Sequence, residues 1–194
     1  MLRVVPLILV LGTGCTDSLD PLQRDGVAEA AGNAVGTAPI YLALAGITPA
    51  PTTLVTGTRD SFVIDGTVSS PSSGTAQLAG AGGTTANTLD MHLSAKLVAW
   101  RDEFWKVTLD GTLDVVDTAT FGDPAAPLPT KLLQHITGEL EVSGKDRYAF
   151  DLEICYRGNG QVFGYNRSGM TGTVEGEPVV DQVAGFDSTC DPAP

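Results

Sequence analysis

The chain has 194 residues, which is enough for one domain with a substantial hydrophobic core. It carries 23 acidic residues against 11 basic ones, and its formal net charge at pH 7 is −12. A field of this sign repels phosphate backbones and anionic head groups, so the composition disfavours nucleic-acid binding and electrostatic docking on a membrane. We therefore expect no nucleic-acid partner.

The N-terminal segment, MLRVVPLILVLGTGC, has the layout of a secretion signal. A single positive charge at Arg3 precedes a short apolar run, and small residues separate that run from Cys15. The run is shorter than the stretch of about 20 apolar residues that a membrane-spanning helix needs. We therefore expect residues 1–14 to be cleaved from the mature protein.

The residues before Cys15 resemble the lipobox of bacterial lipoproteins, in which Leu, a small residue and Gly or Ala precede the cysteine. Thr13 and Gly14 match this pattern, whereas Leu11 lies one position too far upstream and Gly12 takes its place. The resemblance covers only the signal, and it implies that Cys15 carries a lipid. A plain signal peptide cut nearby, or a simple hydrophobic N-terminus, is the alternative.

The same resemblance implies a location and a domain layout. Thr16, and not Asp, follows Cys15, and the sorting rule of these lipoproteins then favours the outer membrane of the bacterial cell envelope. Residues 15–20 would form the lipidated cysteine and a tether, and residues 21–194 a single β-rich domain. The expected partner is therefore a membrane, reached through the lipid anchor.

If Cys15 carries lipid, the two other cysteines of the chain form an even set. Cys155 and Cys190 are then candidates for a disulfide, as expected for an exported protein. The bond would close a loop of about 35 residues and stabilise the fold by roughly 3 to 4 kcal/mol. Two free thiols in a reducing compartment are the alternative.

A helix is predicted after the tether. Asp20 is a suitable N-cap, Pro21 suits the first helical position, and Gln23 completes the spacing of a capping box. The apolar segment PIYLALAG, residues 39–46, is either a buried strand or the end of that helix, because its periodicity does not decide.

Thr, Ser, Gly, Pro and Ala dominate two segments that follow. Residues 48–60 and 69–87 have this composition, which is typical of loops and hairpin ends. We therefore predict loops or mobile hairpin ends in both segments.

From residue 88 onward, apolar and polar residues alternate as they do in antiparallel strands with one packed and one solvated face. The first two strands are expected to form a hairpin around Arg101 and Asp102, and a Pro-rich loop spans residues 118–130. Asn-Gly at positions 159 and 160 is a strong turn signal. The predicted strands cover residues 89–99, 105–115, 132–142, 148–156, 161–165 and 169–175.

A short pattern recurs four times as IDGTV, LDGTL, ITGEL and MTGTV. Its glycines share the apolar face with the large residues on either side, which lets a long sheet bend. The glycines are Gly66, Gly111, Gly138 and Gly172. Their irregular spacing argues against a solenoid or propeller. We predict a mainly β fold, a strongly curved antiparallel sheet or barrel of about 7–9 strands, with a short N-terminal helix against it.

The sequence shows little catalytic or metal-binding chemistry. Asp90, His92 and Ser94 share one strand face, but their Cα atoms would lie about 6.6 Å apart, whereas proton transfer needs about 3 Å. The chain has two histidines, and no metal-ligand spacing occurs. We therefore expect no metal, no cofactor and no enzyme, with an envelope hydrolase as the third-ranked hypothesis.

Several large side chains share the inward face of the predicted strands. They are either ordinary core or the lining of an apolar pocket. The candidate lining residues are Met91, Trp105, Tyr148, Phe150, Ile154 and Tyr156. The leading hypothesis is a non-catalytic, lipid-anchored envelope domain with a structural or binding role. The alternative is a carrier of a lipid or other apolar ligand, and an envelope protein is a further candidate partner.

Overall fold

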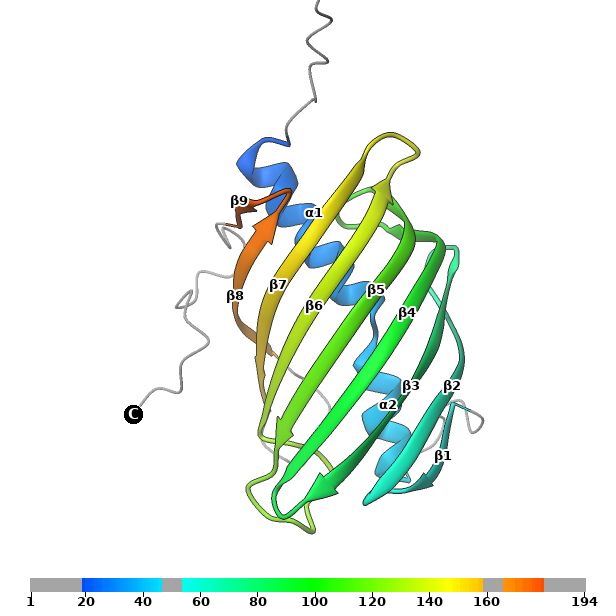
Figure 1. Ribbon diagram of the computed structural model, residues 1–194, viewed down its shortest axis with the longest axis vertical. Helices are drawn as coiled ribbons and strands as arrows, with labels where there is room; N and C mark the ends of the chain where they lie inside the picture. The colour runs from blue at the N-terminus through cyan, green and yellow to red at the C-terminus, as the bar shows by residue number, and fades with distance from the viewer. Residues whose placement is uncertain (1–18, 47–53, 159–165, 180–194) are drawn as a thin grey trace, which may run out of the picture.

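The computed structural model describes residues 19–46, 54–158 and 166–179 (Figure 1). The signal segment with Cys15, the strand expected over residues 161–165, and Cys190 lie outside the described residues. Two helices and one antiparallel sheet make up the described part of the chain.

The described strands form one sheet in which each strand pairs with the next along the chain, in the order β1 to β9 (Figure 1). The strands are β1 (Val55–Thr58), β2 (Ser61–Ser69), β3 (Thr75–Thr85), β4 (Thr88–Asp102), β5 (Val107–Thr120), β6 (Lys131–Val142), β7 (Arg147–Arg157), β8 (Asn166–Val174) and β9 (Glu177–Pro178). The mainly β, antiparallel prediction is confirmed. Neither the barrel nor the strong curvature is confirmed, because the described strands form an open sheet that does not curl strongly.

The predicted helix begins where the capping signals place it. Helix α1 (Pro21–Ala34) starts after Asp20, whose Oδ1 accepts a hydrogen bond of 2.8 Å from the Gln23 amide. The Gln23 Oε1 in turn accepts a bond of 3.1 Å from the Asp20 amide, which completes the capping box. The segment PIYLALAG belongs to a second helix, α2 (Thr37–Leu44), so the strand alternative for residues 39–46 is wrong.

Small residues let α1 lie close against one face of the sheet (Figure 1). A Cβ added at Gly26 would lie 2.3 Å from Cε3 of Trp105, and one at Gly32 would lie 2.6 Å from Cδ1 of Ile154. Ala28 and Ala31 of the same helix are fully buried. The face of the sheet that α1 covers is therefore the packed face, and the opposite face meets solvent.

Paired strands occur in the two segments that were predicted as loops from their composition. Strand β3 runs through the second segment and pairs with both β2 and β4. Ala76 and Leu78 of β3 are buried while Gln77 is exposed, so the alternation is present but carried by small residues. The loop prediction for residues 69–87 is wrong, because pairing on both sides outweighs weak intrinsic strand propensity.

The first predicted hairpin exists, but its turn lies later in the chain. Strand β4 continues through Arg101 and Asp102, and the turn to β5 covers residues 103–106. At the other end β5 continues to Thr120, which shortens the Pro-rich loop to residues 121–130.

That loop closes one end of the space between the sheet and the helices. Phe121 and Leu128 are buried in the core. The Arg59 guanidinium lies 3.8 Å above the centre of the Phe121 ring and donates a hydrogen bond of 2.8 Å to the Ala126 carbonyl. At the opposite end, which carries the turns 103–106 and 143–146, the space between the sheet and α1 contains a groove.

Three of the four glycines of the recurring pattern, Gly111, Gly138 and Gly172, are required by the backbone itself. Gly111 and Gly138 have φ values of +144° and +142°, a region that other residues rarely adopt. A Cβ at either glycine would also lie 2.5 Å from a carbonyl oxygen of the neighbouring strand, of Glu139 or Thr112 respectively. At these glycines the pattern therefore marks places where adjacent strands approach closely.

We predict that Gly138→Ala lowers the free energy of unfolding by roughly 2 to 4 kcal/mol, because it adds both backbone strain and a clash with a carbonyl. Gly122→Ala is the matched control, since Gly122 has no positive φ and its Cβ would lie 3.4 Å from Cγ2 of Thr130. Urea unfolding followed by tryptophan fluorescence measures both variants. Equal stability of the two variants would contradict this interpretation.

Candidate functional site

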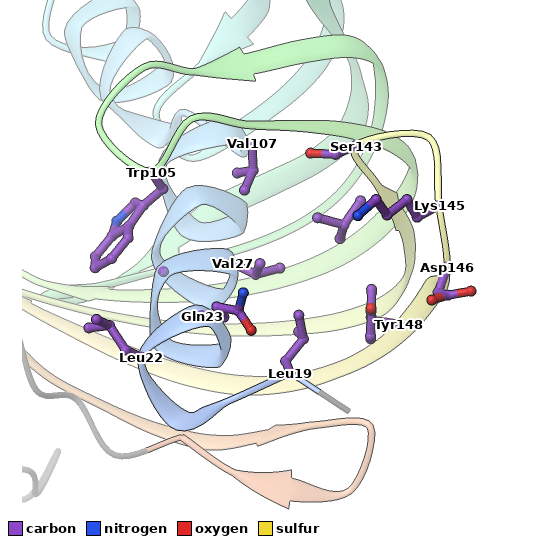
Figure 2. A pocket seen from close by; sticks show the side chains of 12 residues that line it. Leu19, Leu22, Gln23, Val27, Trp105, Val107, Ser143, Lys145, Asp146 and Tyr148 are labelled. Atoms are coloured by element: carbon purple, nitrogen blue, oxygen red, sulfur yellow. The ribbon is translucent and has the colours of Figure 1, made fainter. Parts of the chain in front are cut away.

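A groove of about 600 Å³ lies between the first half of α1 and the turns that join β4 to β5 and β6 to β7 (Figure 2). Apolar side chains from both the helix and the sheet form most of its wall, and polar groups stand at its rim. The lining residues are Leu19, Leu22, Gln23, Gly26, Val27, Trp105, Val107, Val142, Ser143, Lys145, Asp146 and Tyr148.

The turn that carries Trp105 is held in place by a buried carboxylate. Asp102, 9% exposed, accepts a hydrogen bond of 2.9 Å from the Trp105 amide through Oδ1. Its Oδ2 accepts a second bond of 3.2 Å from the Asn33 side-chain amide of α1. Asp102 therefore ties the β4–β5 turn to α1 and fixes the position of Trp105 beside the groove.

The Trp105 ring forms one wall of the groove and continues into an exposed aromatic neighbour. The Phe104 ring meets it edge to face, with ring centres 5.1 Å apart and an interplanar angle of 82°. On the other side, Gly26 leaves room for the Trp105 ring against α1. This wall is therefore apolar and aromatic from the helix outward to solvent.

Charged and polar groups at the rim come from the β6–β7 turn. Lys145 and Asp146 are exposed there, next to Ser143, whose amide donates a hydrogen bond of 2.7 Å to the Thr108 carbonyl. An apolar wall with a few polar groups at the opening is the usual form of a site for a small apolar or amphipathic ligand.

The structure separates the six candidate pocket residues into two groups. Trp105 and Tyr148 line the groove. Met91, Phe150 and Ile154 are buried in the core at 3% exposure or less, and Tyr156 is partly buried against it.

The groove residues of α1 were missed from the sequence. Leu22 and Val27 supply the helical side of the groove. Their signal was present, because they are the large apolar residues in a helix otherwise made of small and polar ones. The sheet-based pattern could not reveal them.

The Asp90, His92 and Ser94 set does not form a catalytic arrangement in the described structure. The Asp90 carboxylate accepts a hydrogen bond of 3.0 Å from the Thr118 hydroxyl, and none of the three side chains bonds to another. His92 and Asp90 are exposed on the solvent face of β4.

A histidine and a carboxylate do meet on the solvent face of the sheet. His135 Nε2 lies 2.8 Å from Asp151 Oδ1, with the two side chains 50% and 70% exposed. Exposed pairs of this kind contribute little to stability. Within the described ranges, no group of three His, Cys, Asp or Glu side chains could hold a metal ion.

One acidic residue lies in the core, and the sequence interpretation passed over it. Asp117 of β5 is fully buried and pairs across strands with Gln134 of β6, which is also buried. Burial raises the pKa of Asp117 from 3.8 to about 8, against the opposing effect of the Gln134 side chain, which lowers it. Neither carboxyl oxygen accepts a hydrogen bond from a described residue at an ordinary distance and angle. The carboxyl is therefore protonated at neutral pH.

This raised pKa predicts a pH-dependent stability. Between about pH 4 and pH 8 the unfolded chain releases the Asp117 proton while the folded chain keeps it, so the free energy of unfolding falls by up to about 1.4 kcal/mol per pH unit. The fold is therefore most stable with respect to this group below pH 4, where Asp117 is protonated in both states, and the loss of stability is complete by about pH 8.

We expect Asp117→Asn to abolish this slope, so that the variant gains stability relative to the wild type when the pH rises from 5 to 8. Urea unfolding at the two pH values measures the difference, and Asp114→Asn, at an exposed position of the same strand, is the control. Parallel pH dependence of the wild type and Asp117→Asn would show that the carboxyl ionises normally in the fold.

Of the three cysteines, the structure describes only Cys155. Cys155 is 2% exposed, although the strand alternation places it on the solvent face. The register between β7 and β8 shifts directly after it. Cys190 and Cys15 lie outside the described residues, so the disulfide and the lipidation stay predictions.

Comparisons of the chain with protein-family models, with curated proteins and with solved structures give no match. Neither α1 nor α2, the helices of the described ranges, is long and apolar enough to cross a membrane.

Proposed function

We propose that this protein is a non-catalytic, lipid-anchored domain of the bacterial cell envelope that uses the groove beside α1 as a binding site. The observation that carries the proposal is the position of the groove. Leu19, the first described residue, lines it and lies four residues after Cys15. The binding site and the anchor therefore belong to the same end of the domain.

The lipobox-like segment supports the anchor, and Thr16 supports the outer membrane as its place. The net charge of −12 gives the domain no electrostatic attraction to anionic lipids, so a covalent lipid is the feature that would hold it there. The groove combines apolar side chains with polar ones, and its partner is accordingly a small apolar or amphipathic ligand or an apolar segment of an envelope protein.

We expect Cys15→Ser to abolish incorporation of a clickable fatty-acid analogue during growth, because the thiol is the site of lipid attachment. The variant should also leave the membrane fraction. Mass measurement of the mature wild-type protein should show a chain that begins at Cys15 and carries a diacylglyceryl group. Persistent label in Cys15→Ser would exclude the anchor.

A carrier of a lipid or other apolar molecule is the second candidate. The volume of about 600 Å³ favours it, because small-molecule sites span roughly 300 to 1,000 Å³. As a carrier the protein would also need the strongly curved sheet that the inward glycines favour, with α1 as one wall of the binding space.

We expect native mass spectrometry of the purified protein to show a bound molecule in the mass range of a fatty acid or phospholipid. Val107→Trp places a large ring in the groove and should lower the occupied fraction about tenfold, since the ligand and the ring compete for the same space. Val116→Trp, on the solvent face of β5, is the matched control. A ligand bound equally by both variants would place the site elsewhere.

A further inference from the structure

The groove end of the domain presents an exposed apolar surface to solvent. Phe104 is 73% exposed and Leu22 is 53% exposed, and the partly exposed Trp105 lies between the helix and Phe104. Figure 2 shows the Leu22 and Trp105 side chains on the same side of α1, where the Trp105 ring packs against Gly26. We call Leu22, Phe104 and Trp105 the apolar edge.

The other exposed large apolar residues of the described chain do not form such a cluster. Val63, Val98 and Val116 lie on β2, β4 and β5, and their cross-strand partners are Ala81, Thr75 and His92. Single exposed apolar side chains are normal on soluble surfaces. The apolar edge differs because it gathers two aromatic rings and a leucine in one place.

The length of chain before the described residues limits how far this edge can lie from the anchor. Cys15 precedes Leu19 by four residues, which span at most about 14 Å when fully extended. Leu19 and Leu22 line the same groove. A bilayer that holds a lipid on Cys15 is therefore within reach of the apolar edge.

We propose that the apolar edge inserts into the interfacial layer of the bilayer that holds the Cys15 lipid, and so orients the domain with the groove toward the membrane. This proposal rests on the proposed anchor. Tryptophan is enriched at the membrane–water interface, and because Trp105 Nε1 is buried, the exposed part of its ring is the apolar part. Lys106 and Lys145 are exposed at the same end and can keep their ammonium groups in the head-group layer.

The charge of the chain defines the kind of membrane surface. A net charge of −12 opposes approach to anionic lipids, so the contact is apolar and the partner is the acyl and glycerol region of a zwitterionic bilayer. The diacyl anchor already supplies the binding strength. The edge adds orientation, and it lets an apolar ligand pass between the bilayer and the groove without crossing water.

Quenching of Trp105 by brominated lipid tests the proposal. The chain has two tryptophans, and Trp100 is 6% exposed, so Trp100→Phe leaves Trp105 as the reporter. Residues 1–15 are replaced by an oligohistidine tag, and the protein is bound to phosphatidylcholine vesicles that contain a little nickel-chelating lipid. With acyl-brominated phosphatidylcholine, we expect Trp105 emission to fall by about half.

Paired variants distinguish the edge from general tethering. Leu22→Ser with Phe104→Ser should reduce the quenching at least threefold, whereas Val63→Ser with Val116→Ser should leave it unchanged, since these valines have similar exposure on the solvent face. Circular dichroism checks that all variants fold. No quenching of Trp105, or equal quenching in both paired variants, would overturn the proposal.

The tagged protein lacks Cys15, so this assay tests the apolar edge independently of the anchor. If Trp105 is quenched in this assay but the native protein carries no lipid on Cys15, the membrane contact of the apolar edge is supported and the anchor is excluded. Light scattering tests a second occupant of the apolar edge. If the protein is a dimer that Leu22→Ser with Phe104→Ser dissociates, and Trp105 is not quenched, the apolar edge binds a second copy of the chain instead.

Discussion

The close packing of α1 on the sheet is the interaction on which the rest of the described structure depends. An open antiparallel sheet has one apolar face that must be covered, and here a single helix with small residues covers much of it. Gly26 and Gly32 bring the helix backbone within contact of Trp105 and Ile154. Larger residues would hold the helix away from the sheet and leave voids along its length.

The strand alternation could be predicted from the sequence because its face-to-face contrast was strong. From Leu89 onward the inward residues are large and the outward ones polar, and β4 to β7 follow this pattern. Strand β3 was missed because most of its residues are Thr, Ala and Gly, and its pairing depends on two neighbouring strands. A bulge was also invisible: Ala99 has a φ of +47°, so Trp100 and not Ala99 is buried.

The candidate site was only half predictable. Tyr148 belongs to a strand with a clear pattern, and Trp105 lies in the turn directly before β5, which continues the same alternation. Leu22 belongs to a helix whose glycines weaken its signal. Asp117 has the inward parity of β5, and so its burial could have been read from the alternation that identified Val115. An ionisable group in a core costs stability at high pH, and composition alone gives no hint of that cost.

The position of the groove follows from how the two ends of the packed layer are filled. The loop after β5 places Phe121 and Leu128 in the core at one end, where Arg59 secures it. At the other end, α1 begins beside the short turns of β4–β5 and β6–β7, and the groove lies between them. The described fold thus places its accessible apolar surface at the start of α1, where Leu19 is the first described residue. The proposed binding site and the apolar edge therefore share one end of the described structure.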